Sequence, residues 1–261
     1  MAKKRKYRNN ESISYIKLSI VGLLVFFLGY ATLQRLNSQL VDVKIEITKS
    51  DSKKYLLTKK DVKQKLKGIL GYDISLANIG QLDLYNLETL LDRDDRINKS
   101  DLFLDKNNRL HIVIEQRQPI VRIQVSGGDD YYLDFDGGRI PVTETFRVPV
   151  VTGHVDQYVS NYKGIKDNNL KDVWELSQRI YENDFLRVLV EQIDVNAQGD
   201  IIIAPKFPHS KIVLGDALDI DGKLNRISDY YKGLKKAGFD AKYNEVDVQY
   251  EDQVVRRPAN S

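Results

Sequence analysis

The sequence predicts an α+β protein that is anchored to a membrane by one transmembrane helix and folds into two domains beyond it. One uncharged apolar run occupies residues 18–33. After this run, helical and alternating apolar patterns follow one another to the end of the chain. Roughly 225 residues remain there, which is enough for two compact domains with cores of their own.

The apolar run is long enough to cross a bilayer. Counted from residue 16 to residue 33 it contains 18 residues, which as a helix span about 27 Å, close to the thickness of the hydrocarbon core. Tyr15 and Tyr30 are suited to the interfacial zones, and Lys17 can extend to the head groups. We therefore expect a basic tail over residues 1–15 and a transmembrane helix over residues 16–34.

The flanking charges predict the orientation of this helix. Six Lys and Arg residues precede the apolar run or border it, against the single acid Glu11. The positive-inside rule then keeps the amino terminus in the cytoplasm and exports the rest of the chain. The alternative is a cleaved signal peptide, because Gly29 and Ala31 are small residues at the spacing of a cleavage site. The length of the run favours an uncleaved anchor.

Composition limits the chemistry of the exported part. The chain has no Cys, so disulfides and thiolate catalysis are excluded. The net charge is +3 and the sequence pI is about 8.7. Without the six bases and one acid of the head, 34 Lys and Arg face 36 Asp and Glu. The basic pI therefore reflects membrane topology, and we expect no binding to nucleic acid.

The first exported domain, residues 42–117, reads as β-α-α-β-β. Alternating apolar residues over 41–47 indicate a strand, and Thr58 with Asp61 is typical of a capped helix start. A second helix should begin at Asp83. The segments 100–104 and 109–115 then predict two strands joined by the turn at residues 106–108.

The second exported domain, residues 118–258, reads as a mixed α/β domain. Asn168 or Asn169 can cap one helix, and another should begin near Gly222. Short strands are expected at 201–204 and 211–214. Within the segment 245–255, Val246, Val248 and Tyr250 alternate with polar residues, so we predict one long closing strand that forms an exposed late edge of the sheet.

No short motif indicates catalysis, a metal or a cofactor. His111, His154 and His209 lie far apart, without the spacing of a metal site or a His-based triad. Residues 134–137 and 219–222 resemble the start of a calcium loop, but both lack its later acidic ligands. A hairpin turn and a helix cap are the better interpretations. We expect no catalytic, cofactor-binding or metal-binding residues.

Several segments in this order resemble one known family. The β-α-α-β-β order behind a membrane anchor resembles the POTRA module. Residues 116–122, Gln-Arg-Gln-Pro-Ile-Val-Arg, are similar to the Glu-Arg-x-Pro-x-Ala-Arg stretch that follows this module in the FtsQ/DivIB family of bacterial cell-division proteins. Residues 148–153, Val-Pro-Val-Val-Thr-Gly, resemble the family's Leu-Pro-hydrophobic-x-Gly segment. Gln116 and Val121 depart from the family's Glu and Ala.

The resemblance covers nearly the whole chain and implies a function. It implies a non-enzymatic divisome scaffold at the septum of the cell inner membrane, with a POTRA domain at 42–117 and a β-domain at 118–258. It also implies an inter-domain motif of Arg117, Pro119 and Arg122. Partners of the FtsB/FtsL type would bind by strand addition through the closing strand, where the expected contact residues are Val246, Val248, Gln249, Tyr250, Glu251, Asp252 and Val254.

Two alternatives remain open at this stage. Tyr250, which the resemblance makes the aromatic anchor, shares one strand face with Val246 and Val248, so it could instead pack in the core. The chain could also be an exported, membrane-anchored cell-wall enzyme. Such an enzyme would require a cleft with convergent carboxylates whose pKa values are perturbed. A third class, an outer-membrane translocation protein, would need a carboxy-terminal barrel for which the chain is too short.

Overall fold

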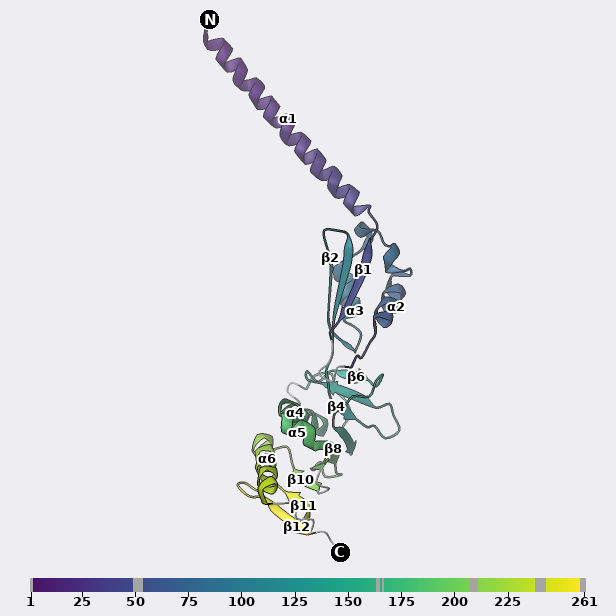
Figure 1. Ribbon diagram of the computed structural model, residues 1–261, viewed down its shortest axis with the longest axis vertical. Coiled ribbons are helices and arrows are strands. Elements are labelled where there is room, and N and C mark those ends of the chain that lie inside the picture. Colours follow the sequence, from purple (N-terminus) through teal and green to yellow (C-terminus); the bar gives the residue numbers. More distant parts are fainter. Residues whose placement is uncertain are drawn as a thin grey trace. The chain divides into compact units, whose positions relative to one another are not determined.

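The computed structural model describes residues 2–48, 54–162, 165, 167–206, 211–237 and 243–258. The chain divides into two compact units, which are described separately (Figure 1). Unit 1 comprises Met1–Thr48 and Leu57–Glu115, and unit 2 comprises Lys49–Leu56 and Gln116–Ser261.

Unit 1 begins with a long helix, α1, from Ala2 to Leu36. Its segment Lys17–Leu36 is long and apolar enough to cross a membrane, and none of it is buried within the protein. The helix starts well before the apolar run, so it also includes the residues predicted as a basic tail. The apolar segment itself agrees with the sequence prediction of one candidate span.

The rest of unit 1 is a small sheet with two helices. Its strand order is β1-β3-β2, and β1 runs parallel to β3. The elements follow the predicted order β-α-α-β-β, with two short 3-10 turns between the helices: β1 Asp42–Ile47, α2 Lys59–Leu70, η1 Ile74–Leu76, η2 Ile79–Gln81, α3 Leu84–Leu91, β2 Ile97–Leu104 and β3 Arg109–Gln116.

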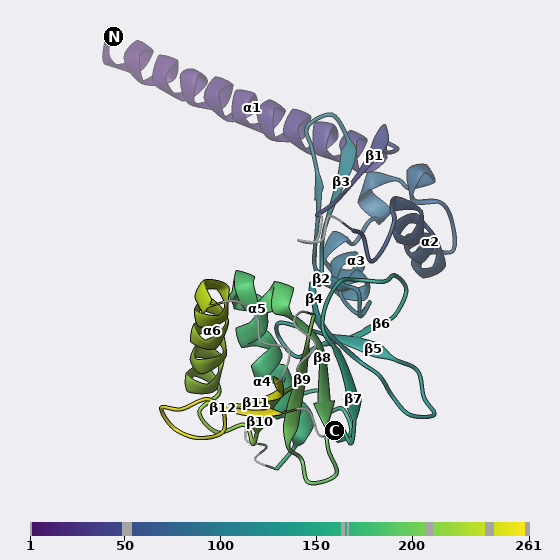
Figure 2. The same ribbon diagram turned by 60° about the horizontal axis from the view of Figure 1, so that its bottom comes forward.

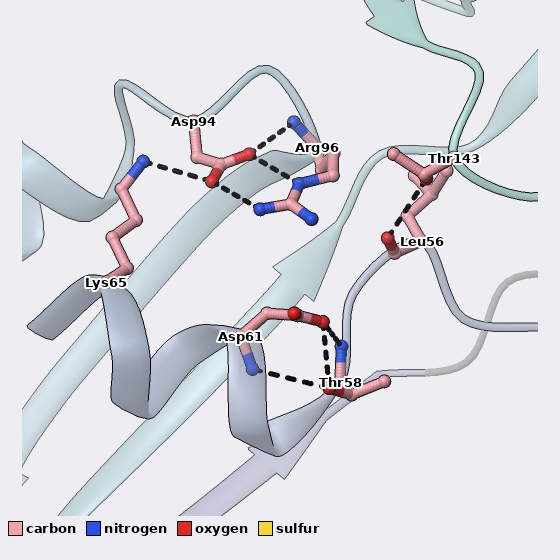
Figure 3. A network of polar contacts seen from close by, with 7 residues as sticks. All are labelled: Leu56, Thr58, Asp61, Lys65, Asp94, Arg96 and Thr143. Atoms are coloured by element: carbon pink, nitrogen blue, oxygen red, sulfur yellow. Dashed lines mark hydrogen bonds and ion pairs between the residues drawn. The ribbon is translucent and has the colours of Figure 1, made fainter.

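Local sequence explains the start and end of α2. The Asp61 backbone N–H donates to Thr58 Oγ1 (3.3 Å), and the Thr58 N–H donates to Asp61 Oδ2 (2.6 Å), which forms the predicted capping box (Figure 3). Gly71 ends the helix with a φ of +80°, a conformation that favours glycine. Between these ends, α2 buries Val62 and Leu66 in the core of the unit.

Unit 2 is built on a nine-stranded mixed sheet with the order β12-β11-β10-β9-β8-β7-β4-β5-β6. Its elements are β4 Pro119–Ile123, β5 Tyr131–Asp134, β6 Arg139–Pro141, β7 Val150–Gly153, α4 Asn169–Glu182, α5 Asp184–Leu189, β8 Val190–Val195, β9 Ile201–Pro205, β10 Lys211–Gly215, α6 Ile220–Ala237, β11 Tyr243–Asp247 and β12 Val255–Pro258.

The helices of unit 2 cover one face of this sheet. α4 and α5 connect the parallel pair β7 and β8, and α6 connects the parallel pair β10 and β11. Both connections advance in the same direction along the sheet, so two right-handed crossovers place all three helices on the same face (Figure 2). One continuous core lies between helices and sheet, including Leu170 and Leu176 of α4, Ile193 of β8 and Val246 of β11.

The prediction of one closing strand over 245–255 is wrong. The chain forms two antiparallel strands, β11 and β12, with a turn at residues 250–252 between them. Asp247 causes the bend, because its Oδ1 accepts the backbone N–H of Gln249 (3.0 Å) and draws the chain out of the strand. Asp252 then adopts a φ of +57°, which Asp tolerates better than most residues. An alternating pattern cannot distinguish this hairpin from one long strand.

Asp94 joins two segments of unit 1 in an ion-pair network. Its Oδ2 lies 3.0 Å from Lys65 Nζ and 2.9 Å from an Arg96 guanidinium nitrogen (Figure 3). Burial by itself would raise the pKa of Asp94, but the hydrogen bonds from Arg96 and Lys65 outweigh it and hold the pKa well below its usual range. The network ties α2 to the segment between α3 and β2.

This network predicts acid sensitivity of unit 1. Because the folded-state pKa of Asp94 is depressed, its stabilising effect is complete above the unfolded-state pKa of about 4 and is lost as the pH falls below it. We expect Asp94→Asn to lower the free energy of unfolding by about 2 kcal/mol at pH 7 and by progressively less as the pH falls. Chemical denaturation across pH measures this, with the neighbouring exposed Asp95→Asn as the control. A deficit that does not change with pH would contradict the prediction.

Gln116 predicts a second stability effect, in unit 2. Its Oε1 accepts the Leu56 N–H (2.7 Å) and its Nε2 donates to the Lys54 carbonyl (3.0 Å), while only 7 % of the residue is exposed. A glutamate, the residue of the family motif, could accept the first bond but could not donate the second when ionised. We expect Gln116→Glu to lower the free energy of unfolding by about 1–3 kcal/mol at pH 7.

Protonation should partly restore the stability of Gln116→Glu, because a neutral carboxyl group can donate to the Lys54 carbonyl. The exposed Gln124→Glu is the control, and denaturation at pH 7 and at lower pH is the measurement. Parent-like stability of Gln116→Glu at pH 7 would show that this donation contributes nothing.

Candidate partner-binding edge of the large sheet

A sheet edge is a candidate binding site because its unpaired N–H and C=O groups can pair with a strand from another protein. The two sheets described here end in four edge strands, β1 and β2 in unit 1 and β6 and β12 in unit 2. The four edges differ in how far side chains of the same unit already bind or protect their main-chain groups, and in their length.

The β2 edge is occupied by carboxylates from the end of α3. Glu88 Oε1 accepts the N–H of Leu102 (2.6 Å), and Asp92 Oδ1 accepts the N–H of Ser100 (2.7 Å). These two donors are two residues apart, so they point to the same side of the strand. A partner strand could pair with β2 only by breaking both charge-assisted bonds.

The β1 and β6 edges are less suited to strand addition than β12. β1 exposes the charged residues Asp42, Lys44 and Glu46 in alternation, and natural proteins use such charges to protect sheet edges. β6 contains three residues, Arg139–Pro141, which provides few main-chain groups for pairing.

β12 is the outer strand at the other end of the large sheet. Its neighbour β11 is interior, because it pairs in parallel with β10 and antiparallel with β12. Val255 is half-buried, and the three following residues of β12 are exposed. The edge that the sequence placed over 245–255 is therefore found at Val255–Pro258.

An ion-pair network holds β12 against β11. Arg257 binds Glu245 Oε1 (2.6 Å) and Asp247 Oδ2 (2.8 Å), and Glu245 also binds Lys211 of β10 (2.7 Å). The side chain of Asp247 is fully buried. The hydrogen bond from Lys211, together with that from Arg257, lowers the pKa of Glu245 despite its partial burial. The network thus links the last three strands of the sheet.

The predicted contact residues fall into two groups. Val246 and Val248 are buried in the core of unit 2, and Val254 packs partly against it. Tyr250, Glu251 and Asp252 lie in the exposed connection between β11 and β12. Tyr250 is 47 % exposed, so the alternative that it is a core residue is wrong. The side chain of Gln249 bonds to Asp247 (3.2 Å) and closely approaches Gly215.

Sequence reasoning missed a second exposed apolar residue near this connection. Leu218 lies in the turn between β10 and α6, which also contains Asp219. Arg226 links this turn to the segment after β11, because it lies 3.5 Å from Asp219 Oδ2 and donates to the Val248 carbonyl (3.2 Å). Leu218 and Tyr250 are thus exposed on two neighbouring loops. The sequence signal that could have identified Leu218 is its position as an apolar residue among the acids of a turn.

The three residues of the predicted inter-domain motif lie in or next to the β4–β5 hairpin of unit 2. Arg117 forms an ion pair with Asp134 (2.5 Å), and Arg122 forms one with Asp130 (2.6 Å). Pro119 is the first residue of β4, a strand position that tolerates proline. Their role between the domains remains a prediction.

The acidic segments 134–137 and 219–222 form a hairpin turn and a helix start, as the sequence favoured. Asp134 accepts the N–H groups of Asp136 and Gly138 in a hairpin turn, and Asp219 accepts the N–H of Gly222 at the start of α6. Within the part of the chain that the structure describes, no group of three or more His, Cys, Asp or Glu side chains could hold a metal ion. His209 lies outside the described residues.

The burial of Asp247 predicts how strongly β12 depends on its network. Asp247→Ala removes the buried carboxylate that accepts hydrogen bonds from Arg257 and from the backbone and side chain of Gln249, so we expect a lower free energy of unfolding and a less firmly held β12. Amide exchange in residues 255–257 should also become faster. The control is Asp229→Ala, which removes an exposed ion pair with Lys232 and should cost less than about 1 kcal/mol. Equal losses for the two variants would contradict the role assigned to Asp247.

Comparison with known proteins places this site in a family. A family model described as FtsQ/DivIB, C-terminal related, matches residues 118–256, which is more than half of the chain. The match runs from the start of the β4 segment into β12 and includes Glu245 and Asp247. No protein in the curated set matches the chain. The chain belongs to the FtsQ/DivIB family of bacterial cell-division proteins.

Proposed function

We propose that this protein is a membrane-anchored scaffold of the bacterial divisome that binds other division proteins through its exported domains. Membership of the FtsQ/DivIB family supports a role in cell division. The candidate span Lys17–Leu36 supports a single-pass anchor in the cell membrane. The six basic residues at or before its start favour an amino terminus in the cytoplasm, with both units outside and located at the septum.

The proposed domain organisation is a POTRA domain at 42–117 followed by a β-domain at 118–258. The β-α-α-β-β order of unit 1 and its sheet order β1-β3-β2 support the first assignment. The family match begins at residue 118 and supports the second. Arg117, Pro119 and Arg122 would fix the beginning of the β-domain through their contacts with the β4–β5 hairpin.

The proposed binding mode is strand addition by an FtsB/FtsL-like partner to β12. The observation that carries it is an open edge strand beside an exposed tyrosine. Main-chain groups of Val255–Pro258 would supply affinity, and Tyr250 would supply an aromatic anchor. Glu251, Asp252 and Val254 lie between them and would contact the partner, while Val246, Val248 and Gln249 would support the edge from within.

The alternative of an exported cell-wall enzyme is less well supported. A glycoside hydrolase needs a pair of carboxylates, one of which acts as an acid with a raised pKa. The paired carboxylates of this site, Glu245 and Asp247, are both bound to Arg257. The pKa of Glu245 is lowered, which is opposite to the shift that a general acid requires.

Tyr250→Ala tests the proposed anchor. Truncation of a central aromatic contact typically costs about 2 kcal/mol, so we expect about thirtyfold weaker binding. The melting temperature should change little, because Tyr250 is half-exposed. The measurement is titration of the full-length protein, in detergent micelles, with a peptide from the exported part of an FtsB-like partner. Tyr85→Ala removes an even more exposed tyrosine on α3 and is the matched control.

Two proline variants test the strand addition itself. Consecutive residues of an edge strand direct their N–H groups to opposite sides. Of Val255→Pro and Arg256→Pro, one should therefore lose a bond to β11 and melt earlier, while the other loses a donor to the partner. We expect the second variant to stay folded and to bind at least about tenfold more weakly. Normal binding by both folded variants would refute strand addition at β12.

A further inference from the structure

A groove on unit 2 lies apart from the β12 edge. It consists of two adjoining depressions of about 490 and 400 Å³ that share lining residues from the segment before β7 and from α5. We call it the basic groove and define it by Lys54, Arg147, Val148, Arg187, Val188 and Lys206.

The topology of the sheet separates the basic groove from β12. The groove lies at the ends of β7, β8 and β9, since Val150 and Val190 line it and Lys206 directly follows β9. β10 and β11 stand between β9 and β12 in the strand order. A ligand in the groove therefore would not occupy the edge that strand addition requires.

The charge of the groove is strongly positive. Four cations line it, Lys54, Arg147, Arg187 and Lys206, and among the described lining residues there is one carboxylate, Glu191. Arg187 binds Asp184 (2.6 Å), but that carboxylate is almost fully exposed, so the ion pair is weak. The cations come from four separate parts of the chain and are distributed along both depressions. This arrangement creates an extended positive field.

The groove also exposes apolar surface. α5 buries Leu186 and Leu189 in the core, yet it leaves Val188 64 % exposed among the cations. Val148 is half-buried, and the buried Phe146 also lines both depressions. Val188 therefore offers a contact for one apolar side chain of a ligand, and the surrounding cations attract carboxylates beside it.

We propose that the basic groove binds an extended acidic segment of a partner protein, with carboxylates at the cations and an apolar side chain over Val188. A single phosphate group would need several donors converging on one point. The cations here are instead spread over two depressions, which suits carboxylates spaced along a polypeptide. The proposal does not depend on strand addition at β12.

The test uses the full-length protein in micelles of an uncharged detergent. The probe is a fluorescein-labelled peptide, Glu-Leu-Glu-Glu-Val-Glu-Glu-Leu, and its counterpart has Lys at every Glu position. We expect the acidic peptide to bind and the basic one not to bind. Arg147→Glu combined with Lys206→Glu should raise the Kd at least about tenfold, and Val188→Asp should weaken binding as well. Raising the salt from about 50 to 300 mM should also weaken it, because salt screens exposed charges.

Matched variants separate the groove from general surface charge. Arg187→Glu disrupts an exposed ion pair with a residue three positions earlier, and Lys232→Glu disrupts an equivalent pair with Asp229 on α6. Of these two variants, only Arg187→Glu should weaken binding of the acidic peptide. Tyr250→Ala should leave this binding unchanged, which distinguishes failure at the groove from failure at β12. Thermal unfolding checks that each variant is folded.

Three results would overturn the proposal. One is parent-like binding of the acidic peptide by the folded charge-reversal variants. Another is equal binding of the basic peptide. The third is binding of phosphatidylglycerol vesicles that requires Arg147 and Lys206 while the acidic peptide does not bind, since that outcome would assign the groove to a membrane surface.

Discussion

The organisation of the proposed binding edge depends on one buried carboxylate. Asp247 ends β11, and its side chain is fully buried, which is costly unless every oxygen has a partner. Its partners are Arg257 and the backbone and side chain of Gln249, all of which follow it in the sequence. The charge can be buried only if the chain turns back at once. Asp247 therefore determines both the turn and the position of β12 beside β11.

Among the described strands, β12 pairs with β11 alone. The β2 edge of unit 1 is bonded along its outer side by Glu88 and Asp92, so its N–H groups already have acceptors. The network of Arg257, Glu245 and Lys211 instead lies between β12 and the strands within the sheet. Carboxylates therefore act differently at the two edges. At β2 they bind the outer N–H groups of the strand, and at β12 they hold the strand in place through Arg257, in the position proposed for pairing.

Local patterns in the sequence were sufficient for part of the fold. The capping box of Thr58 and Asp61, the hairpin turn at Asp134 and the element order of unit 1 all follow from interactions within a few residues. The closing strand was mispredicted because Val246, Val248 and Tyr250 alternate in the same way in a strand and in a strand followed by a turn. Neither the bond from the Gln249 N–H to Asp247 at the bend nor the pairing of Asp247 with Arg257 across the hairpin leaves a periodic signal.

The candidate sites show the same limit. Tyr250 was named from the resemblance, but its exposure depends on the bend that Asp247 imposes. The cations of the basic groove are isolated in the sequence, and only the crossover from β7 through α5 to β8 brings Arg147 and Arg187 to one surface. No composition or spacing rule marks such a set, because its members belong to different elements.

The two surfaces proposed here differ in what they can discriminate. Pairing with β12 uses main-chain groups that every polypeptide carries, so it provides affinity with little sequence preference, and selectivity must come from side chains such as Tyr250. The basic groove acts in the opposite way, since charge attraction depends on the ligand's composition and contributes more to selection and association rate than to affinity. A scaffold with the proposed function would use both properties. Because the two surfaces lie at different places on one sheet, residues of one can be substituted without disturbing the other.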